Sequence, residues 1–152
     1  MQNESAGCGP TQADCDPDNV DPRYLAFFDC FNRQLFYEAH DALEPLWLEV
    51  RHSTDGNFFK GLIQLAGAFV HWQNDRLGPA RALLGTGRAY LAGYPKSHHR
   101  LDVAVVLRLV DEWLRWLDPI AIGGRPSGKM APPQLLVHDG LCPAPELLIN
   151  GP

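Results

Sequence analysis

One histidine and one carboxylate stand a helical turn apart in the stretch FYEAHDALEPLW (36–47). At 100° per residue, Glu44 falls about 40° from His40 on a helical wheel, and apolar side chains flank both positions. The pattern predicts that the two lie in the middle of a buried helix face, with Asp41 toward solvent. An imidazole and a carboxylate at this spacing can reach each other. They need further partners, because an unpaired buried charge is costly.

Further partners are available on the next predicted helix. Lys60, Gln64 and His71 lie within about 40° of one another on its wheel, beside small residues. If this polar arc faces the helix of His40, five polar groups converge. If it faces water, they do not, and the sequence alone leaves both arrangements open.

Three interpretations of this set follow from its chemistry. It is a hydrogen-bonded network that fixes helix register, or a small-molecule or catalytic site. In the second case His40 or Glu44 moves a proton and Lys60 or Gln64 orients the ligand. In the third, His40, Glu44 and His71 hold a divalent metal ion as N, O and N ligands with an open position. The second histidine of a zincin motif is missing, so metalloprotease chemistry is not supported.

The other histidines and the cysteines are expected to carry less chemistry. His98 and His99 follow a Pro-Lys pair and are expected in a solvated loop, while His52 and His138 have no partner spacing. The cysteines form no C-x-x-C pair and are expected as buried or surface thiols: Cys8, Cys15, Cys30 and Cys142.

Helical periodicity and capping residues indicate five helices. Asp21 can cap the first, with Pro22 at its first position, and Asp102 can cap the last. Pro45 should kink or divide the second helix, because it cannot donate to a carbonyl four residues back. We expect the first helix to begin at residue 22, the second to span 36–50 and the third to span 58–75. The fourth should begin at residue 78 and the fifth at residue 103. Asn57 is a possible cap of the third helix.

The 152 residues should form one domain. We expect an acidic flexible segment (1–20), a helical bundle (21–118) and a tail rich in proline and glycine (119–152). The fold class is therefore an all-α compact bundle of about five helices with an irregular or partly extended tail. Within the tail, 134–140 and 145–151 could be extended segments that pair with each other or wrap over the bundle.

Composition narrows the range of partners. The net charge of −5 argues against a nucleic-acid or anionic-membrane surface. There is no apolar run of about 18 residues and no signal-like start, so a cytoplasmic location is expected. The expected partner is a small molecule. The alternative is a structural or interaction module, which could form a homo-oligomer and whose polar network has no catalytic role.

Two blocks in order, FNRQLFYEAHDALEPLW (31–47) and FFKGLIQLAGAFVHWQNDRLGPARALL (58–84), give the chain a family resemblance. Over roughly residues 22–117 it resembles the bacterial and archaeal family called domain of unknown function 309. The resemblance implies a small all-helical fold and no particular activity. Gln34 stands where the family usually has glycine, and Asp41 replaces a glutamate. The matching positions are Glu38, His40, Asp41, Glu44, Trp47, Gly61, Leu62, Ile63, Gln64, His71, Gly78, Ala80, Leu83 and Leu84.

Overall fold

In the computed structural model, the described residues are 20–138, and they form five α-helices, a two-stranded hairpin and one 3-10 helix. The expected all-α fold class is confirmed. Three of the cysteines (8, 15 and 142) and the segment 145–151 lie outside the described residues. The elements are α2 (Pro22–Asn32), α3 (Phe36–Val50), α4 (Gly56–Gln73), α5 (Leu77–Leu91), β1 (Ser97–His98), β2 (Leu101–Asp102), α6 (Val103–Leu117) and η3 (Asp118–Ile122).

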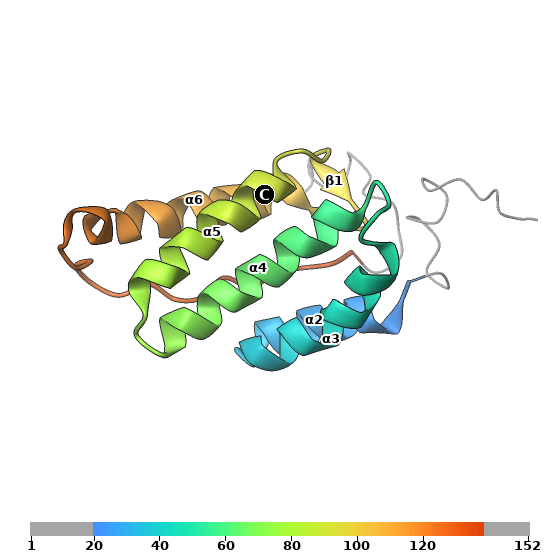
Figure 1. Cartoon of the computed structure of the whole chain (residues 1–152), viewed down its shortest axis with the longest axis horizontal. Coiled ribbons are helices and arrows are strands. Elements are labelled where there is room, and N and C mark those ends of the chain that lie inside the picture. Colours follow the sequence, from blue (N-terminus) through green and yellow to red (C-terminus); the bar gives the residue numbers. More distant parts are fainter. Residues whose placement is uncertain (1–19, 139–152) are drawn as a thin grey trace, which may run out of the picture.

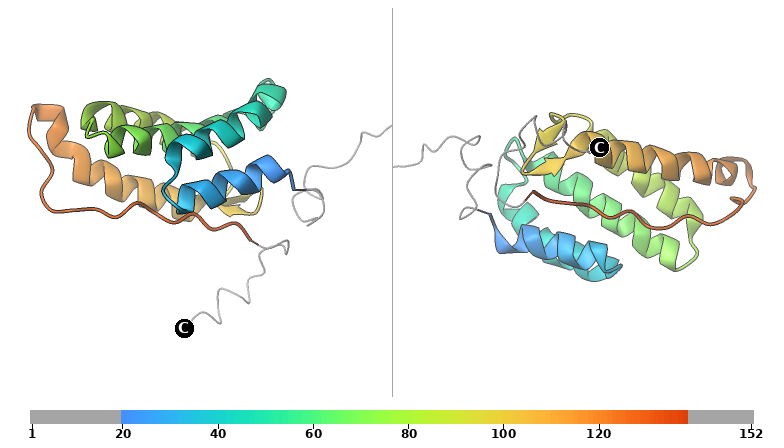
Figure 2. Two further views of the ribbon diagram at one scale, coloured as in Figure 1. Left: turned by 90° about the horizontal axis from the view of Figure 1, so that it is seen from below. Right: turned by 180° about the vertical axis from the view of Figure 1, so that it is seen from behind.

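The helices form two layers. α3, α4 and α5 lie side by side with α4 in the middle (Figure 1), and α2 and α6 make up the second layer. Seen from behind, residues 123–138 run as an extended strap between α2 and α6 (Figure 2). The core between the layers is rich in aromatic side chains that are almost completely buried: Phe27, Phe31, Phe36, Phe58, Phe69 and Trp113.

Two of the five described α-helices, α2 and α6, begin at an aspartate whose side chain caps the helix. The Asp21 carboxylate accepts a hydrogen bond from the Arg23 N–H at 2.8 Å, and Asp102 accepts one from the Val105 N–H at 3.1 Å, so both predicted caps are confirmed. The third helix begins earlier than predicted, since Asp55 and not Asn57 precedes its first residue. Of the two outcomes predicted at Pro45, a kink or a division of the helix, the division was wrong. α3 continues through it, with Leu43 and Leu46 buried on either side of the exposed proline.

The turn between α2 and α3 keeps a backbone conformation that suits glycine. Gln34 has a φ of 63°, in the left-handed region. A residue with a Cβ adopts this conformation at a cost of about 1–2 kcal/mol. Gln34 adopts this conformation although it has a Cβ, and its side chain is exposed.

The first half of the predicted tail packs on the bundle. Asn32 at the end of α2 binds the Leu135 backbone twice, accepting from its N–H at 2.7 Å and donating to its carbonyl at 2.8 Å. Leu135 is buried, and Val137 forms an antiparallel bridge with Leu101 of the hairpin. This segment therefore wraps over the bundle. No helix between residues 20 and 138 has the length and apolar character needed to cross a membrane.

Candidate functional site

His40 and Glu44 lie on α3 as predicted, but not in the middle of its buried face. Their side chains are 34% and 45% exposed. The buried positions of α3 are Phe36, Ala39, Leu43 and Leu46. These residues centre the buried face about 80° away from His40, because Tyr37 and Leu48 on the opposite flank are exposed although apolar. The predicted burial of the pair was therefore wrong, and both residues lie at the edge of the helix–helix contact.

One atom of this pair is nevertheless fully desolvated. The Nδ1 atom of His40 is buried and makes no hydrogen bond with any residue the structure describes. It lies 3.5 Å from Oδ1 of Asp41 and 3.8 Å from Oε1 of Glu44. The three side chains bring one nitrogen and two carboxylate oxygens within 4.8 Å of one another, a set that could hold a metal ion. Asp41 is 57% exposed, as predicted, and its place in this group was missed.

The predicted polar arc of α4 faces away from the core and is half-buried between α3 and α5. The Lys60 ammonium lies 5.0 Å from the ring centroid of Trp47 on α3 and 5.9 Å from that of Tyr90 on α5. Both are cation–π distances. Oε1 of Gln64 and Nδ1 of His71 are buried without a hydrogen-bond partner among the described residues. Within the described chain His71 is not part of the His40 metal group, and convergence of the α4 residues on His40 stays a prediction.

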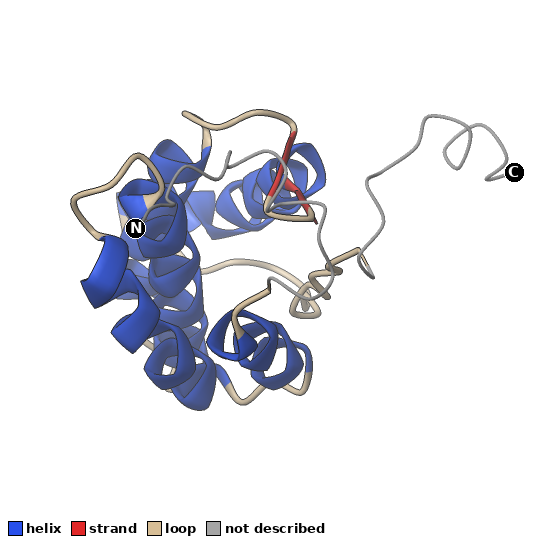
Figure 3. Ribbon diagram, turned by 90° about the vertical axis from the view of Figure 1, so that its right-hand side faces the viewer, coloured by secondary structure: helices blue, strands red, loops and turns tan. Residues whose placement is uncertain are grey.

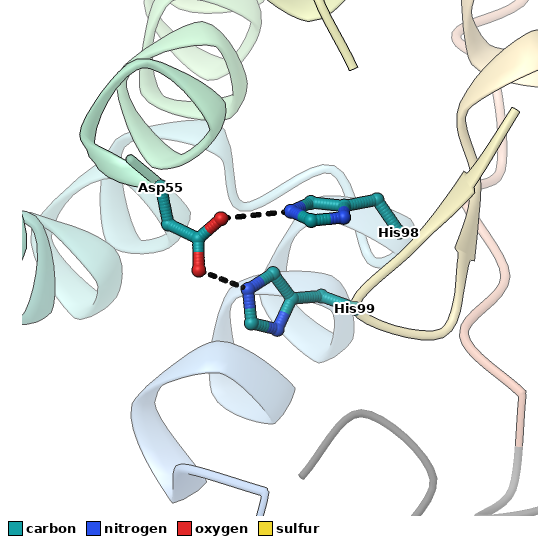
Figure 4. A group of neighbouring side chains, drawn as sticks. All are labelled: Asp55, His98 and His99. Atoms are coloured by element: carbon teal, nitrogen blue, oxygen red, sulfur yellow. Dashed lines mark hydrogen bonds and ion pairs between the residues drawn. The ribbon is translucent and has the colours of Figure 1, made fainter. Parts of the chain in front are cut away.

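A second cluster joins residues that the sequence left apart. Nε2 of His98 and Nε2 of His99 lie 2.8 Å from the two carboxylate oxygens of Asp55, one on each oxygen (Figure 4). The expectation that both histidines are solvated was wrong, since their side chains are 19% and 25% exposed. Because an ionised carboxylate only accepts hydrogen bonds, each Nε2 donates.

The loop before α4 and the hairpin position this cluster. Asp55 occupies the position before α4, where aspartate usually caps a helix, yet its side chain makes no capping bond. The Tyr94 hydroxyl accepts the Phe58 N–H at 2.9 Å and donates to the Thr54 carbonyl at 2.6 Å. The Asp55 carboxylate is thereby free to face the hairpin, which lies at the end of the bundle (Figure 3).

The hairpin turn itself is unusual. His99 and Arg100 connect β1 to β2 with φ values of 47° and 63°. Two-residue turns with positive φ at both positions favour Asn-Gly or Gly-Gly, because a Cβ is strained there. The Tyr24 hydroxyl donates to the His99 carbonyl at 2.7 Å, and the Arg100 carbonyl accepts the His138 N–H at 3.0 Å, so packing holds the strained turn in place.

The Asp55 carboxyl is held in its ionised form, and the cluster lies beside a cavity. Hydrogen bonds from His98 and then His99 hold the pKa of the Asp55 carboxyl well below its usual range, against the opposing effect of burial. Asp55 and His99 line a cavity of about 220 Å³. Its other walls are Val20, Asp21, Tyr24, Leu46, Val50, Ser53, Phe59 and Arg100. No spacing signal could have found this cluster, since Asp55 and His98 lie 43 residues apart.

The fold and its clusters define a small all-helical protein with two groups of side chains that could each hold a metal ion. Residues 24–83 match the model of the family described as Domain of unknown function (DUF309), which confirms the resemblance seen in the sequence. This range includes all five predicted site residues and Asp55, whereas His98 and His99 lie beyond it. No curated protein matches the chain.

Proposed function

We propose that this protein binds a divalent metal ion through His40 and Glu44 on α3, with Asp41 as a further oxygen ligand. The observation that carries the proposal is the buried Nδ1 of His40, which lacks a hydrogen-bond partner among residues 20–138 and has two carboxylates within 3.8 Å. A buried imidazole nitrogen without a partner is unfavourable. An ion shared with the carboxylates would satisfy it.

The donor set narrows the choice of ion. One imidazole nitrogen and two carboxylate oxygens suit Zn²⁺, Mn²⁺ or Fe²⁺. All three ligands come from one turn of α3, so the remaining coordination positions are open to water or to a small molecule. The half-exposed carboxylates favour an ion that exchanges readily over a permanently enclosed one.

The polar arc of α4 suggests how a small molecule would be held beside the ion. In the part of the chain that the structure describes, Gln64 and His71 each carry a buried polar atom without a hydrogen-bond partner. Lys60 supplies a positive charge between two aromatic rings. We propose that these three residues orient the ligand. Such a ligand would carry an acceptor or an anionic group for Lys60 and hydrogen-bonding groups for the other two.

Metal content of the full, untagged chain tests the proposal. We expect isothermal titration with Zn²⁺ and with Mn²⁺ to show one equivalent of bound metal ion. His40→Ala should lose this binding, and His52→Ala should keep it, since His52 is exposed in the loop after α3. In ¹⁵N-labelled protein, which has six histidines, the ring signals of His40 should broaden first when substoichiometric Mn²⁺ is added. Unchanged titration in His40→Ala, together with an unaffected His40 ring, would overturn it.

The structural alternative predicts a different result for the same variant. If the polar groups only fix helix register or a homo-oligomer, His40→Ala should lower stability or change the oligomeric state measured by light scattering, with no metal effect. That result would replace the metal proposal. The expected cytoplasmic location belongs to the same functional proposal, and fluorescence of the tagged protein in cells tests it.

A further inference from the structure

The side chains of Asp55, His98 and His99 form a second cluster of groups that could hold a metal ion. Two imidazoles and one carboxylate, from separate parts of the chain, direct their polar atoms at one point (Figure 4). We propose that these three residues form a divalent transition-metal site, separate from His40, whose open coordination position faces the neighbouring cavity. The proposal does not depend on metal binding at α3.

The distances already approach those of a metal site. The ligand atoms of the three residues lie within 4.8 Å of one another, and each Nε2 is 2.8 Å from a carboxylate oxygen. Two ligands of a tetrahedral zinc ion with bonds of about 2.0–2.1 Å are separated by about 3.3 Å. Each nitrogen–oxygen pair would therefore have to separate by about 0.5 Å for an ion to bind between its two atoms.

The chemistry of the donors fits borderline metals. Two imidazole nitrogens and one carboxylate are the ligands of many Zn²⁺ and Fe²⁺ sites that keep positions open for a substrate. On binding, two N–H···O hydrogen bonds are replaced by two N–metal bonds, and each imidazole moves its Nε2 proton to Nδ1. No net proton is released from the histidines, and Asp55 enters as the carboxylate.

An apolar shell surrounds these polar atoms. The ring centroid of Phe58 lies 4.9 Å from that of His98 and 5.3 Å from that of His99. The ring centroid of Tyr94 lies 5.0 Å from that of His98, and the ring centroid of Phe59 lies 5.3 Å from that of His99. Such packing fixes the orientation of both imidazoles before a ligand arrives, which lowers the cost of binding. It also limits the access of water to the ion.

The turn and the cavity supply the remaining features. The left-handed backbone of His99 and Arg100, which strains residues that carry a Cβ, brings two consecutive histidines to the same carboxylate. Asp55 and His99 then form part of the wall of the 220 Å³ cavity. An ion at this place would be reached by a small molecule with an oxygen or nitrogen donor, and the apolar walls of Leu46, Val50 and Phe59 would contact its body.

Cobalt absorption of the full chain tests the proposal, because Co²⁺ takes zinc sites and its visible bands report coordination. In a His40→Ala background, which removes the proposed α3 ligand, we expect His98→Gln and His99→Gln each to weaken Co²⁺ binding at least tenfold, while exposed His52→Gln keeps the visible bands. Glutamine retains an N–H donor for Asp55, so both variants should fold, which circular dichroism checks. Failure of the α3 proposal would leave this result unchanged.

A second readout uses the unmodified protein. Substoichiometric Co²⁺ should shift the ring signals of His98 and His99 together in ¹⁵N-labelled protein. Bands that persist in both glutamine variants made in the His40→Ala background, a strong thiolate-to-cobalt band, or unshifted His98 and His99 rings would overturn the proposal. A fully folded chain that binds no cobalt would show that the cluster is a structural clamp only.

Discussion

Two glycines of α5 stand two residues apart in opposite surroundings, and alanine should raise the stability at one position but not at the other. A Cβ added at Gly85 would meet no atom of the described residues within 4 Å. A Cβ added at Gly87 would lie 3.0 Å from the Gly61 carbonyl oxygen of α4 and 2.9 Å from Cδ2 of buried Leu65. Gly87 therefore marks the close approach of α4 and α5, whereas Gly85 does not.

The two effects can be estimated separately. Replacing glycine by alanine inside a helix gains about 1 kcal/mol, because the unfolded chain loses freedom and alanine favours the helix. Gly85→Ala should show this gain alone. At Gly87, forcing a methyl group against backbone and a buried leucine costs about 1–3 kcal/mol. Gly87→Ala should therefore lie between no change and a loss of about 2 kcal/mol, and the two variants should differ by about 1–3 kcal/mol.

Urea unfolding followed by far-ultraviolet circular dichroism measures this difference. The midpoint should rise in Gly85→Ala and stay level or fall in Gly87→Ala, with the slope unchanged in both. Each kcal/mol should appear as about 4 °C in thermal unfolding. If Gly87→Ala is as stable as Gly85→Ala, the tight α4–α5 contact does not explain the glycine. Gly85→Ala is also the control for a general effect of alanine on the stability of α5.

Two further changes test the turn and the strap. Gln34→Gly should stabilise the protein by about 1 kcal/mol, because glycine removes the cost of a φ of 63°. A urea midpoint that does not rise would contradict this. Asn32→Ala removes both hydrogen bonds to Leu135 and should cost about 1–3 kcal/mol. Hydrogen exchange at the Leu135 N–H should accelerate, whereas Asn57→Ala, an exposed control, should leave it unchanged.

The parts of the fold that depend on neighbouring residues were predictable. Asp21 and Asp102 each bind an N–H two or three residues ahead, so residue type and local spacing carry the whole signal. The α3 boundaries likewise follow from periodicity. The fold class needed only these local patterns, because helices joined by short connections bury their apolar faces against neighbouring helices.

The burial of His40 was less predictable, because a helical wheel counts apolar residues without knowing what covers them. Tyr37 is 64% exposed and Leu48 is 48% exposed, although both widened the apparent apolar face of α3. Removing them moves the centre of that face toward Leu43. The orientation of a helix about its own axis depends on which neighbours pack on it, and α3 contacts both α2 and α4.

Asp55 shows most clearly why local patterns do not find such a site. In the sequence it precedes a helix and has the residue type of an N-cap, so capping is the role that local spacing assigns. In the fold, Tyr94 reaches the Phe58 N–H from 36 residues away, and the Asp55 carboxylate turns to two histidines that follow Tyr94 closely in the chain. The segment 94–99 thus binds the N–H group at the start of α4 through Tyr94, and it also supplies the two histidines that contact the Asp55 carboxylate. Both the contact of Tyr94 and the contacts of the two histidines require the hairpin to lie against the start of α4, which depends on tertiary structure.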